Sequence, residues 1–401
     1  MHILLLTPQL PYPPQQGTSL RNYHMLKALA QTHQISLLSF TETDLPPNLE
    51  PLHDICRVLP PVSIPSWTRN LRLWKLFTSP LPDLALRLQC EEFSEALEET
   101  LAETNYDAVQ VEGLELATYI ENIRTHSPRS RVVLDCHNAE TELQRRALKA
   151  DLHQPTRWPA AMYSALQIGR LDRFEKWAMC AADAVLAVSE SDRLHLRRLA
   201  VDDPKDITII PNMIDTADYI AVSTSSEMVR YDLVFTGKMD YRPNIDGVLW
   251  FAENVWPLIQ KERPYTTWAI VGQKPHPRLD PLRKMTGITV TGWVEAVQPY
   301  LLESSIYIVP LRIGSGTRLK ILEAMAAAKP VISTTIGVEG FEVEDQKNII
   351  LADDPADWVR ATLELLDHPA RRAALAEAGR RFAEQYDWHR MIPVLSTFYS
   401  G

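Results

Sequence analysis

The sequence predicts an α/β protein with two domains, each built around a parallel sheet. The chain has 401 residues, which is enough for two domains with separate cores. Short apolar runs alternate with helical segments along most of it, and this alternation is typical of parallel sheets covered by helices on both faces. Apolar residues make up 45% and charged residues 23% of the chain, as in ordinary soluble proteins.

The first half of the chain contains a series of strand-like runs. The opening strand at 2–6 is followed by a proline-rich turn at 11–18 and a helix from about 19 to 30. Further strands are expected at 35–40, 108–111, 131–134, 184–188 and 207–210. Because parallel neighbours need a long crossover, the helical segments between these runs indicate one parallel sheet.

The second half repeats this pattern. A strand at 233–238 leads into a turn, and a helix is expected from Arg242 to about Gln260. Further strands are expected at 289–294, 306–311, 331–334 and 349–351, and helices at 318–328, 355–366 and 371–385. Residues 386–388 introduce a last helix.

The strongest functional signal lies in the stretch 306–335, which reads IYIVPLRIGSGTRLKILEAMAAAKPVISTT. Gly314, Ser315 and Gly316 interrupt a buried strand, and Thr317 is a suitable N-cap for the helix that follows. A glycine-rich turn of this kind exposes backbone N–H groups at the positive end of the helix dipole. Such a turn suits an anion, typically phosphate.

The charged residues of this helix support the same interpretation. Arg318 and Lys320 place two cations in the first turn, which costs stability unless an anion lies between them. Glu323 follows Lys320 by three residues, and its Cα is expected roughly 9 Å along the axis from the helix start. Its carboxylate could therefore accept both ribose hydroxyls of a nucleotide diphosphate. The alternative is a solvated i,i+3 ion pair on a core helix.

The segment GSGTRLKILEAMAAAKPVIST resembles the donor-binding segment of GT-B glycosyltransferases of family GT4. The resemblance extends over nearly the whole chain, and it implies two Rossmann-like domains whose parallel sheets face each other across a cleft. It also implies that Glu323 holds the ribose of a nucleotide sugar. One departure is that Ser315 stands where the family usually has a second Glu, eight positions before Glu323.

The resemblance assigns roles to five more residues, and each has a simpler alternative. Gly17 resembles the glycine of the loop on the cleft floor, or it only starts a helix. His137 corresponds to a His near the transferred sugar, or it is a turn histidine. Lys238 matches the position of a cation on the donor diphosphate and Arg242 lies one residue off it, or both belong to a solvated basic loop. Trp293 is the middle residue of a stretch that matches the "GxV" loop near the nucleobase, where it could flank the base, or it packs between domains.

These assignments predict a glycosyltransferase that uses a UDP- or GDP-linked sugar and retains the anomeric configuration. Residues 1–212, with a helix at 387–401 crossing back, would bind the acceptor, and residues 213–386 would bind the nucleotide sugar. Lys238, Arg318, Lys320 and the helix start at Gly316 and Thr317 would stabilise the leaving diphosphate. No Asp-x-Asp pair indicates a metal, and no separate cofactor is expected.

Two other functions stay open. A non-hydrolysing nucleotide-sugar epimerase would share the scaffold, but it needs acids that move a ring proton, and none is visible beside Ser315. A non-catalytic partner in a polysaccharide assembly complex is the second alternative, because the usual Glu is missing at position 315. Hydrolysis of a nucleotide sugar without acceptor would separate these possibilities.

Composition limits the partners. A net charge of -10 argues against nucleic acid, and the four scattered cysteines fit reduced thiols in the cytoplasm. The acceptor is expected to be a glycan, a lipid-linked molecule or a small molecule. In the segment 66–77, Arg69, Arg72 and Lys75 recur every three residues among Trp and Leu. This pattern predicts weak contact with the inner face of the cell membrane, or else an amphipathic helix packed on its own domain.

Overall fold

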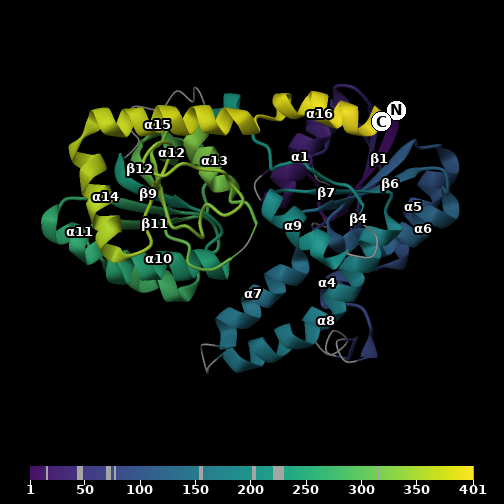
Figure 1. Ribbon diagram of the computed structural model, residues 1–401, viewed down its shortest axis with the longest axis horizontal. Helices are drawn as coiled ribbons and strands as arrows, with labels where there is room; N and C mark the ends of the chain where they lie inside the picture. The colour runs from purple at the N-terminus through teal and green to yellow at the C-terminus, as the bar shows by residue number, and fades with distance from the viewer. Residues whose placement is uncertain are drawn as a thin grey trace. The chain divides into compact units, whose positions relative to one another are not determined.

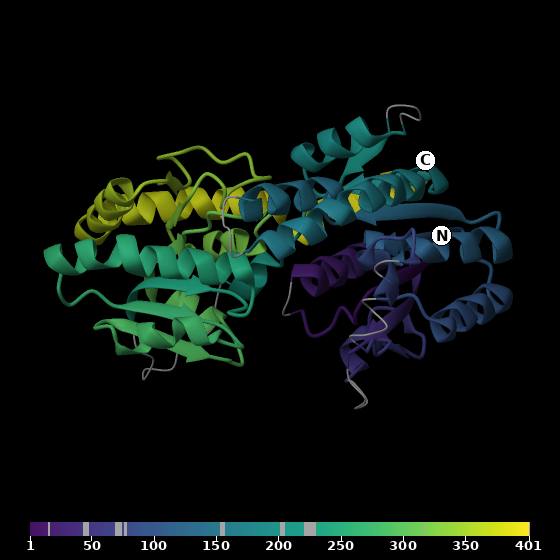
Figure 2. The same ribbon diagram turned by 90° about the horizontal axis from the view of Figure 1, so that it is seen from below.

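A computed structural model describes residues 1–14, 17–42, 48–68, 74–75, 78–152, 157–200, 205–219, 230–314 and 316–400. The chain forms two compact units. Unit 1 comprises Met1–Met213 and Trp388–Gly401, and unit 2 comprises Ile214–Asp387. Both chain ends belong to unit 1 (Figures 1 and 2). These divisions lie one residue after those expected from the sequence, and the acceptor and donor roles of the units stay predictions.

Unit 1 contains a sheet in which every pair of neighbouring strands is parallel. Its strands are β1 His2–Thr7, β2 Gln34–Thr41, β3 Arg57–Val58, β4 Val62–Ser63, β5 Ala108–Glu112, β6 Arg131–Cys136, β7 Ala184–Ala187 and β8 Ile207–Ile209. Their order is β3-β2-β1-β5-β6-β7-β8, and β4 pairs with β2. Strands β2 and β3 are thus added on one side of β1, and strands β5 to β8 are added on its other side. The strand order therefore reverses between β1 and β5, which is the topological switch point of this sheet.

Helices cover both faces of this sheet. They are α1 Gly17–Ala30, α2 Glu50–His53, α4 Asp83–Leu86, α5 Glu91–Glu103, α6 Ile120–His126, α7 Glu140–Leu152, α8 Trp158–Ala181, α9 Glu190–Leu199 and α16 Trp388–Ser400, with the 3-10 helix η1 Leu114–Tyr119. Because successive residues of a strand face opposite sides, Ile3 and Leu5 pack with α1 and α16, whereas Leu4 and Leu6 pack with α5 and α8. Figure 1 shows α7 and α8 as a hairpin that extends from the rest of unit 1.

Unit 2 contains a second parallel sheet. Its strands are β9 Tyr231–Thr236, β10 Trp268–Val271, β11 Ile288–Gly292, β12 Ser304–Val309, β13 Val331–Ser333 and β14 Ile350–Leu351, in the order β11-β10-β9-β12-β13-β14. The switch point lies between β9 and β12. In Figure 1 the strands β9, β11 and β12 lie between α10 and α15. The α/β class with two parallel sheets is therefore confirmed, although β10 is not among the strands expected from the sequence.

The helices of unit 2 are α10 Arg242–Asn254, α11 Trp256–Glu262, α12 Gln298–Leu302, α13 Leu319–Ala326, α14 Pro355–Asp367 and α15 Pro369–Ala383, with the 3-10 helices η3 Thr216–Tyr219, η4 Pro277–Lys284 and η5 Glu384–Tyr386. No helix in the described ranges of either unit is both long and apolar enough to cross a membrane.

Two local expectations about unit 2 are wrong. The single helix expected from Arg242 to about Gln260 is divided at Val255, because Pro257 lacks an N–H group and can only stand in the first turn of a new helix. Thr317 is not the N-cap of α13. That position is taken by Arg318, whose side chain makes no capping hydrogen bond, and the helix begins at Leu319.

Candidate functional site

The carboxyl ends of β9 and β12 form the first candidate site, in unit 2. In open α/β sheets, ligands bind outside the carboxyl ends of the strands at the switch point. Gly237 and Lys238 follow β9 directly, and the glycine-containing loop before α13 follows β12. The topology therefore brings these two segments, which are far apart in the sequence, to one edge of the sheet.

The ends of β9 and β10 require glycine at Gly237 and Gly272, which follow these two neighbouring strands directly. A Cβ atom on Gly272, whose φ is +152°, would lie 1.7 Å from the carbonyl oxygen of Gly237. A Cβ atom on Gly237 would lie 2.6 Å from Nδ2 of Asn244 and 2.8 Å from Nζ of Lys320. The absence of a side chain at Gly237 thus lets a cation from α13 approach the end of β9.

Asn244, in the first turn of α10, joins the two segments. Its Nδ2 donates to the carbonyl oxygen of Lys238 at 2.9 Å, and its Oδ1 accepts from Nζ of Lys320 at 2.9 Å. Lys320 Nζ also donates to the carbonyl oxygen of Thr236 at 2.8 Å and lies 4.2 Å from the ring centroid of Phe235. The ammonium group of Lys320 is therefore fixed against the end of β9, which does not fit the alternative of a solvated ion pair on the helix surface.

This environment changes the acidity of Lys320. Burial, and then the positive charge of Arg318, lower the pKa of Lys320 to about 7, while Glu323 acts in the opposite direction. An anion bound beside the ammonium group would favour its charged form. At neutral pH the amine is thus near the midpoint of its titration, and a bound anion would shift it toward the charged form.

Glu323, one turn after Lys320, receives a hydrogen bond from another element of the unit. The hydroxyl of Tyr219 in η3 donates to Oε1 of Glu323 at 2.9 Å. Within the described part of the chain, no hydrogen bond reaches the other oxygen, Oε2. Burial raises the pKa of Glu323, although Tyr219 and Lys320 oppose the shift. Tyr219 holds the carboxylate in one orientation and leaves Oε2 as an acceptor.

The loop before α13 lies close to the side chain of Arg318. One guanidinium nitrogen of Arg318, Nη1, donates to the carbonyl oxygen of Gly316. A Cβ atom on Gly314, whose φ is +126°, would lie 2.8 Å from the other terminal nitrogen, Nη2. The guanidinium group is therefore folded over the glycines of the loop. Thr317 is half-buried in this loop, and Ser315 lies outside the described residues.

Two further predicted residues of unit 2 lie at strand or helix ends. Trp293 follows Gly292, the last residue of β11, and 65% of its side chain is exposed, so its ring is accessible at the carboxyl edge of the sheet. Arg242 is the half-buried first residue of α10, after the turn of β9.

The second candidate site lies in unit 1, at the carboxyl ends of β5 and β6. The side chain of His137, directly after β6, is 14% exposed, and its Nε2 lies 2.8 Å from Oε2 of the fully buried Glu112. Glu112 was not predicted, although a carboxylate at the end of the run AVQVE is a signal that the sequence offers. Gly17 is the exposed first residue of α1, and among the described residues no atom other than those of its chain neighbours and its own helix backbone lies within 4 Å of a hypothetical Cβ.

Arg21 and Asp135 form a buried ion pair beside Glu112 and His137. Nε and Nη2 of Arg21 donate to the two carboxylate oxygens of Asp135 at 3.0 and 2.8 Å. Glu112, Asp135 and His137 offer ligand atoms within 4.8 Å of one another, as a metal site would. Because Arg21 donates to both oxygens of Asp135, this set is better suited to an ion pair and a histidine–carboxylate pair than to a cation.

The two carboxylates of unit 1 differ in acidity. Burial, together with the charge of Asp135, raises the pKa of Glu112 to about 7. Burial also acts to raise the pKa of Asp135, but the Arg21 guanidinium outweighs it and holds that pKa below its ordinary value. Burial acts to lower the pKa of His137, but the hydrogen bond with Glu112 and the charge of Asp135 outweigh it, so the net pKa is raised. The hydrogen bond between Glu112 and His137 thus favours the protonated ring, while Glu112 itself is a weaker acid than an exposed glutamate.

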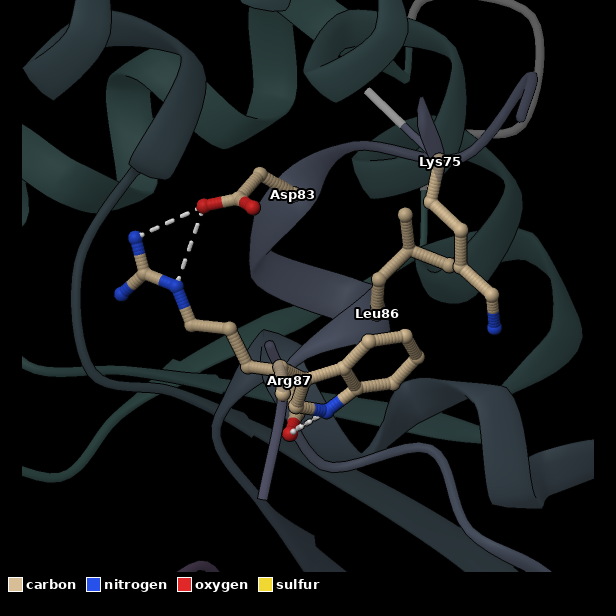
Figure 3. Close-up of a pocket in the computed structure, with 5 residues that line it drawn as sticks. Lys75, Asp83, Leu86 and Arg87 are labelled. Atoms are coloured by element: carbon tan, nitrogen blue, oxygen red, sulfur yellow. Dashed lines mark hydrogen bonds and ion pairs between the residues drawn. The ribbon is translucent and has the colours of Figure 1, made fainter. Parts of the chain in front are cut away.

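The amphipathic segment 66–77 is only partly described, and Arg69 and Arg72 lie outside the described residues. Trp67 Nε1 donates to the carbonyl oxygen of Arg87 at 3.2 Å, and Lys75 Nζ lies 4.3 Å from the centroid of the Trp67 ring. With Asp83 and Leu86 of α4, these residues line a pocket (Figure 3). Trp67 and Lys75 thus pack on unit 1 itself.

Comparison with protein families identifies both halves of the chain. Residues 16–218, half of the sequence, match the family described as Glycosyltransferase Family 4, and residues 230–368 match Glycosyl transferases group 1. The chain belongs to glycosyltransferase family 4. An uncharacterised protein of a Klebsiella pneumoniae cps region is 28% identical over 131 residues, which cover 31% of this chain and 34% of that protein. Glycogen synthase of Mycobacterium tuberculosis is 24% identical over 254 residues, 60% of each chain. The chain thus spans between a third and three fifths of the length of these family relatives.

Solved structures show the same GT-B fold. Sucrose-phosphate synthase from Thermosynechococcus elongatus superposes with a TM-score of 0.73 at 16% identity, covering 100% of this chain and 98% of the other. Anabaena HepE, solved in complex with UDP and glucose, gives a TM-score of 0.66 at 13% identity and covers 99% of both chains. At these identities the likeness extends to the fold, and the ligands belong to the relatives.

Proposed function

We propose that the protein transfers a sugar from a UDP- or GDP-linked donor to a glycan or lipid-linked acceptor, with retention of the anomeric configuration. Family membership supports the reaction class, and the observation that carries the proposal is the position of Lys320. Its amine is fixed at the switch point of unit 2 between the ends of β9 and β12, where a pyrophosphate is expected in this topology.

The cationic side chains of unit 2 are suited to stabilise the negative charge that develops when the donor's glycosyl–phosphate bond breaks. Cleavage between the anomeric carbon and the diphosphate oxygen leaves negative charge on the diphosphate. Lys320 and Arg318, with the backbone N–H groups at the start of α13, would stabilise that charge, and Lys238 and Arg242 would do so from the turn of β9. Charge that is positioned before the reaction is usually the largest contribution to catalysis of this kind.

The remaining residues of unit 2 would hold the nucleoside. Glu323, oriented by Tyr219, would accept the ribose hydroxyls through Oε2. The exposed ring of Trp293 would stack on the nucleobase. Gly316, Thr317 and Ser315 belong to the loop at the start of α13 and would contact the phosphates or the donor sugar.

Unit 1 would handle the acceptor and the transferred sugar. Because Nε2 of His137 is engaged with Glu112, the other ring nitrogen, Nδ1, is the atom that can meet a sugar hydroxyl. Gly17, which has open space around it, would allow a ligand to approach the start of α1.

A nucleotide-sugar panel tests the proposal. Titration calorimetry with UDP, GDP and their sugar conjugates identifies the donor, and release of nucleotide is then followed with and without acceptors. We expect binding of one nucleotide series and slow hydrolysis without acceptor. Interconversion of two nucleotide sugars would instead support the epimerase, and tight binding without any turnover would support the non-catalytic partner.

We also propose weak contact of unit 1 with an anionic membrane surface, which would present a lipid-linked acceptor. Trp158, Met162 and Leu166 recur every four residues on α8 and are exposed, Met162 by 74%. Between 145 and 173, six Arg and Lys residues stand against two Asp residues, in a chain whose net charge is -10. Three of these cations form ion pairs, Arg145 with Asp172, Arg146 with Glu142 and Arg157 with Asp151, so the excess positive charge of this segment is modest. Apolar side chains flanked by cations favour an anionic lipid interface.

Vesicle co-sedimentation tests this contact. We expect weak pelleting with anionic vesicles at low salt, none with neutral vesicles, and loss of pelleting in a Trp158/Met162/Leu166→Ala variant. A Leu258/Tyr265→Ala variant is the matched control, because both side chains are exposed on unit 2. Failure of the unmodified protein to pellet with anionic vesicles at low salt would exclude this contact. An Arg69/Arg72/Lys75→Glu variant tests the contribution of the segment 66–77.

A further inference from the structure

A chain of hydrogen bonds connects the last helix of unit 1 to His137. The hydroxyl of Tyr399 in α16 donates to Oε1 of Gln110, and Nε2 of Gln110 donates to Oε1 of Glu112. The other carboxylate oxygen of Glu112, Oε2, lies 2.8 Å from Nε2 of His137. All four residues belong to unit 1, and Gln110 and Glu112 are fully buried.

The donors and acceptors of this chain fix one another. Burial, then the charges of Glu112 and Asp135, hold the pKa of the Tyr399 phenol well above its ordinary value, so the hydroxyl stays protonated and donates. Because it donates to the oxygen of the Gln110 amide, the amide nitrogen must face Glu112. Glu112 then accepts at both oxygens, and the proton between Glu112 and His137 lies on Nε2 of the ring.

The position of these residues indicates more than packing. Gln110 and Glu112 alternate with apolar residues on β5 and share the sheet face that α1 and α16 cover, where the core is otherwise largely apolar. A buried polar group in such surroundings is costly unless it is paired. Tyr106, whose hydroxyl is buried on the same unit, has no hydrogen-bond partner for it among the described residues, so a buried tyrosine here does not require such a chain.

The end of α16 is held in place near Tyr399. Nη1 of Arg131 donates to the carbonyl oxygen of Phe398 at 2.7 Å, and the guanidinium group lies 4.7 Å from the centroid of the Phe398 ring. Arg131 is the first residue of β6, the strand that His137 follows. The same strand therefore anchors the helix at one end and presents the histidine at the other.

We propose that Tyr399 is a positioning residue for His137 and acts through Gln110 and Glu112. The C-terminal helix would thus set the tautomer and orientation of the histidine that meets the sugar, so that Nδ1 is presented as an acceptor. This inference rests on the proposed role of His137 in the transfer reaction.

Tyr399→Phe tests the inference, with Tyr106→Phe as the matched control. Nitrogen-15 NMR of labelled histidine follows the ring of His137, assigned by the loss of its signals in His137→Gln. Without the hydroxyl, the Gln110 amide can rotate and Glu112 loses a donor, so the proton affinity of Glu112 rises and the titration of His137 should shift from that of the wild type. Turnover should fall about two- to tenfold, the effect of one hydrogen bond, while KM for the donor stays constant because unit 2 is unchanged. Tyr106→Phe should change none of these quantities.

A double-variant cycle tests whether Tyr399 acts on His137 through Gln110. If Tyr399 acts through Gln110, Tyr399→Phe should have no further effect on the His137 titration in a Gln110→Leu background. Equal effects in both backgrounds, or an unchanged His137 titration in Tyr399→Phe, would overturn the inference. Failure of the proposed role of His137 is a separate result, because His137→Gln would then keep full turnover whether or not the titration of the wild-type ring depends on Tyr399.

Discussion

Binding of a nucleoside diphosphate should draw a proton onto Lys320. The empty site holds the pKa of Lys320 at about 7, chiefly because the amine is buried and secondarily because Arg318 is near. A bound diphosphate adds negative charge beside the amine and raises its pKa. Since the complex then binds more protons than the free protein, affinity should weaken as the pH rises above 7, by up to about tenfold per pH unit.

The expected proton uptake follows from this pKa. With a pKa of about 7, roughly one tenth of the free protein carries the Lys320 proton at pH 8, about half at pH 7 and about nine tenths at pH 6. If the complex is fully protonated, binding of UDP takes up about 0.9, 0.5 and 0.1 protons at these three pH values. Titration calorimetry in buffers of different ionisation enthalpy measures this number directly.

Two variants isolate the contribution of Lys320. Lys320→Met removes the amine, and the difference from wild type cancels the ionisation of UDP itself. Lys329→Met is the matched control, because Lys329 also donates to two backbone carbonyl oxygens, at 2.6 and 3.0 Å, and its pKa is likewise lowered by burial, but it lies beyond the opposite end of α13. Identical uptake by wild type and Lys320→Met at pH 8 would refute the reasoning. Loss of proton uptake in Lys329→Met would show that the uptake does not arise specifically at the start of α13, where the diphosphate is expected.

Three further changes test the remaining residues of unit 2. Glu323→Ala should weaken UDP binding by about 1.5–3 kcal/mol and 2′-deoxy-UDP binding by less, in calorimetric titrations, and equal affinities of variant and wild type would exclude the ribose contact. Gly237→Ala should lower UDP affinity at least about tenfold, because its Cβ would lie 2.6 Å from Nδ2 of Asn244, and unchanged affinity would mean that the turn adapts freely. Trp293→Ala should cost about 1–3 kcal/mol of nucleotide binding if the ring stacks on the base, while the melting temperature stays constant, as expected for an exposed side chain.

The local pattern of apolar and polar residues was sufficient to predict most strands and helices of the fold. Six strands of unit 1 lie within one or two residues of their expected bounds, because apolar runs bounded by turns determine them, whereas the two-residue strands β3 and β4 were not expected from the sequence. β10 was not predicted, although Trp268–Val271 is a buried apolar run of the same length as β7, which was predicted. The division at Val255 was overlooked because the sequence around Pro257 is otherwise a good helix former on both sides.

The residues of the candidate site in unit 2 also differ in whether the sequence could predict them. Lys320 and Glu323 could be selected from sequence because glycines, helix and charges are adjacent in one segment. Asn244 and Tyr219 could not, because they contact these residues from 76 and 104 positions away. Sequence also gave no direction for the Lys320 side chain. That direction depends on the carbonyl oxygen of Thr236, a backbone atom with no sequence signature.

If Lys320 contacts the donor diphosphate as proposed, the burial that lowers its pKa would also help the site to release its product. A permanently charged amine at this position would bind the leaving diphosphate tightly throughout the cycle. Because Lys320 is largely neutral in the empty site above pH 7, the population competent to bind is only the protonated fraction, and apparent affinity falls in proportion. During transfer the growing negative charge would keep the proton on the amine, where it would stabilise the leaving group. After the diphosphate has left, the contacts with Thr236 and Asn244 would hold the neutral amine in the same place, so the next donor would meet an amine that is positioned but not yet charged.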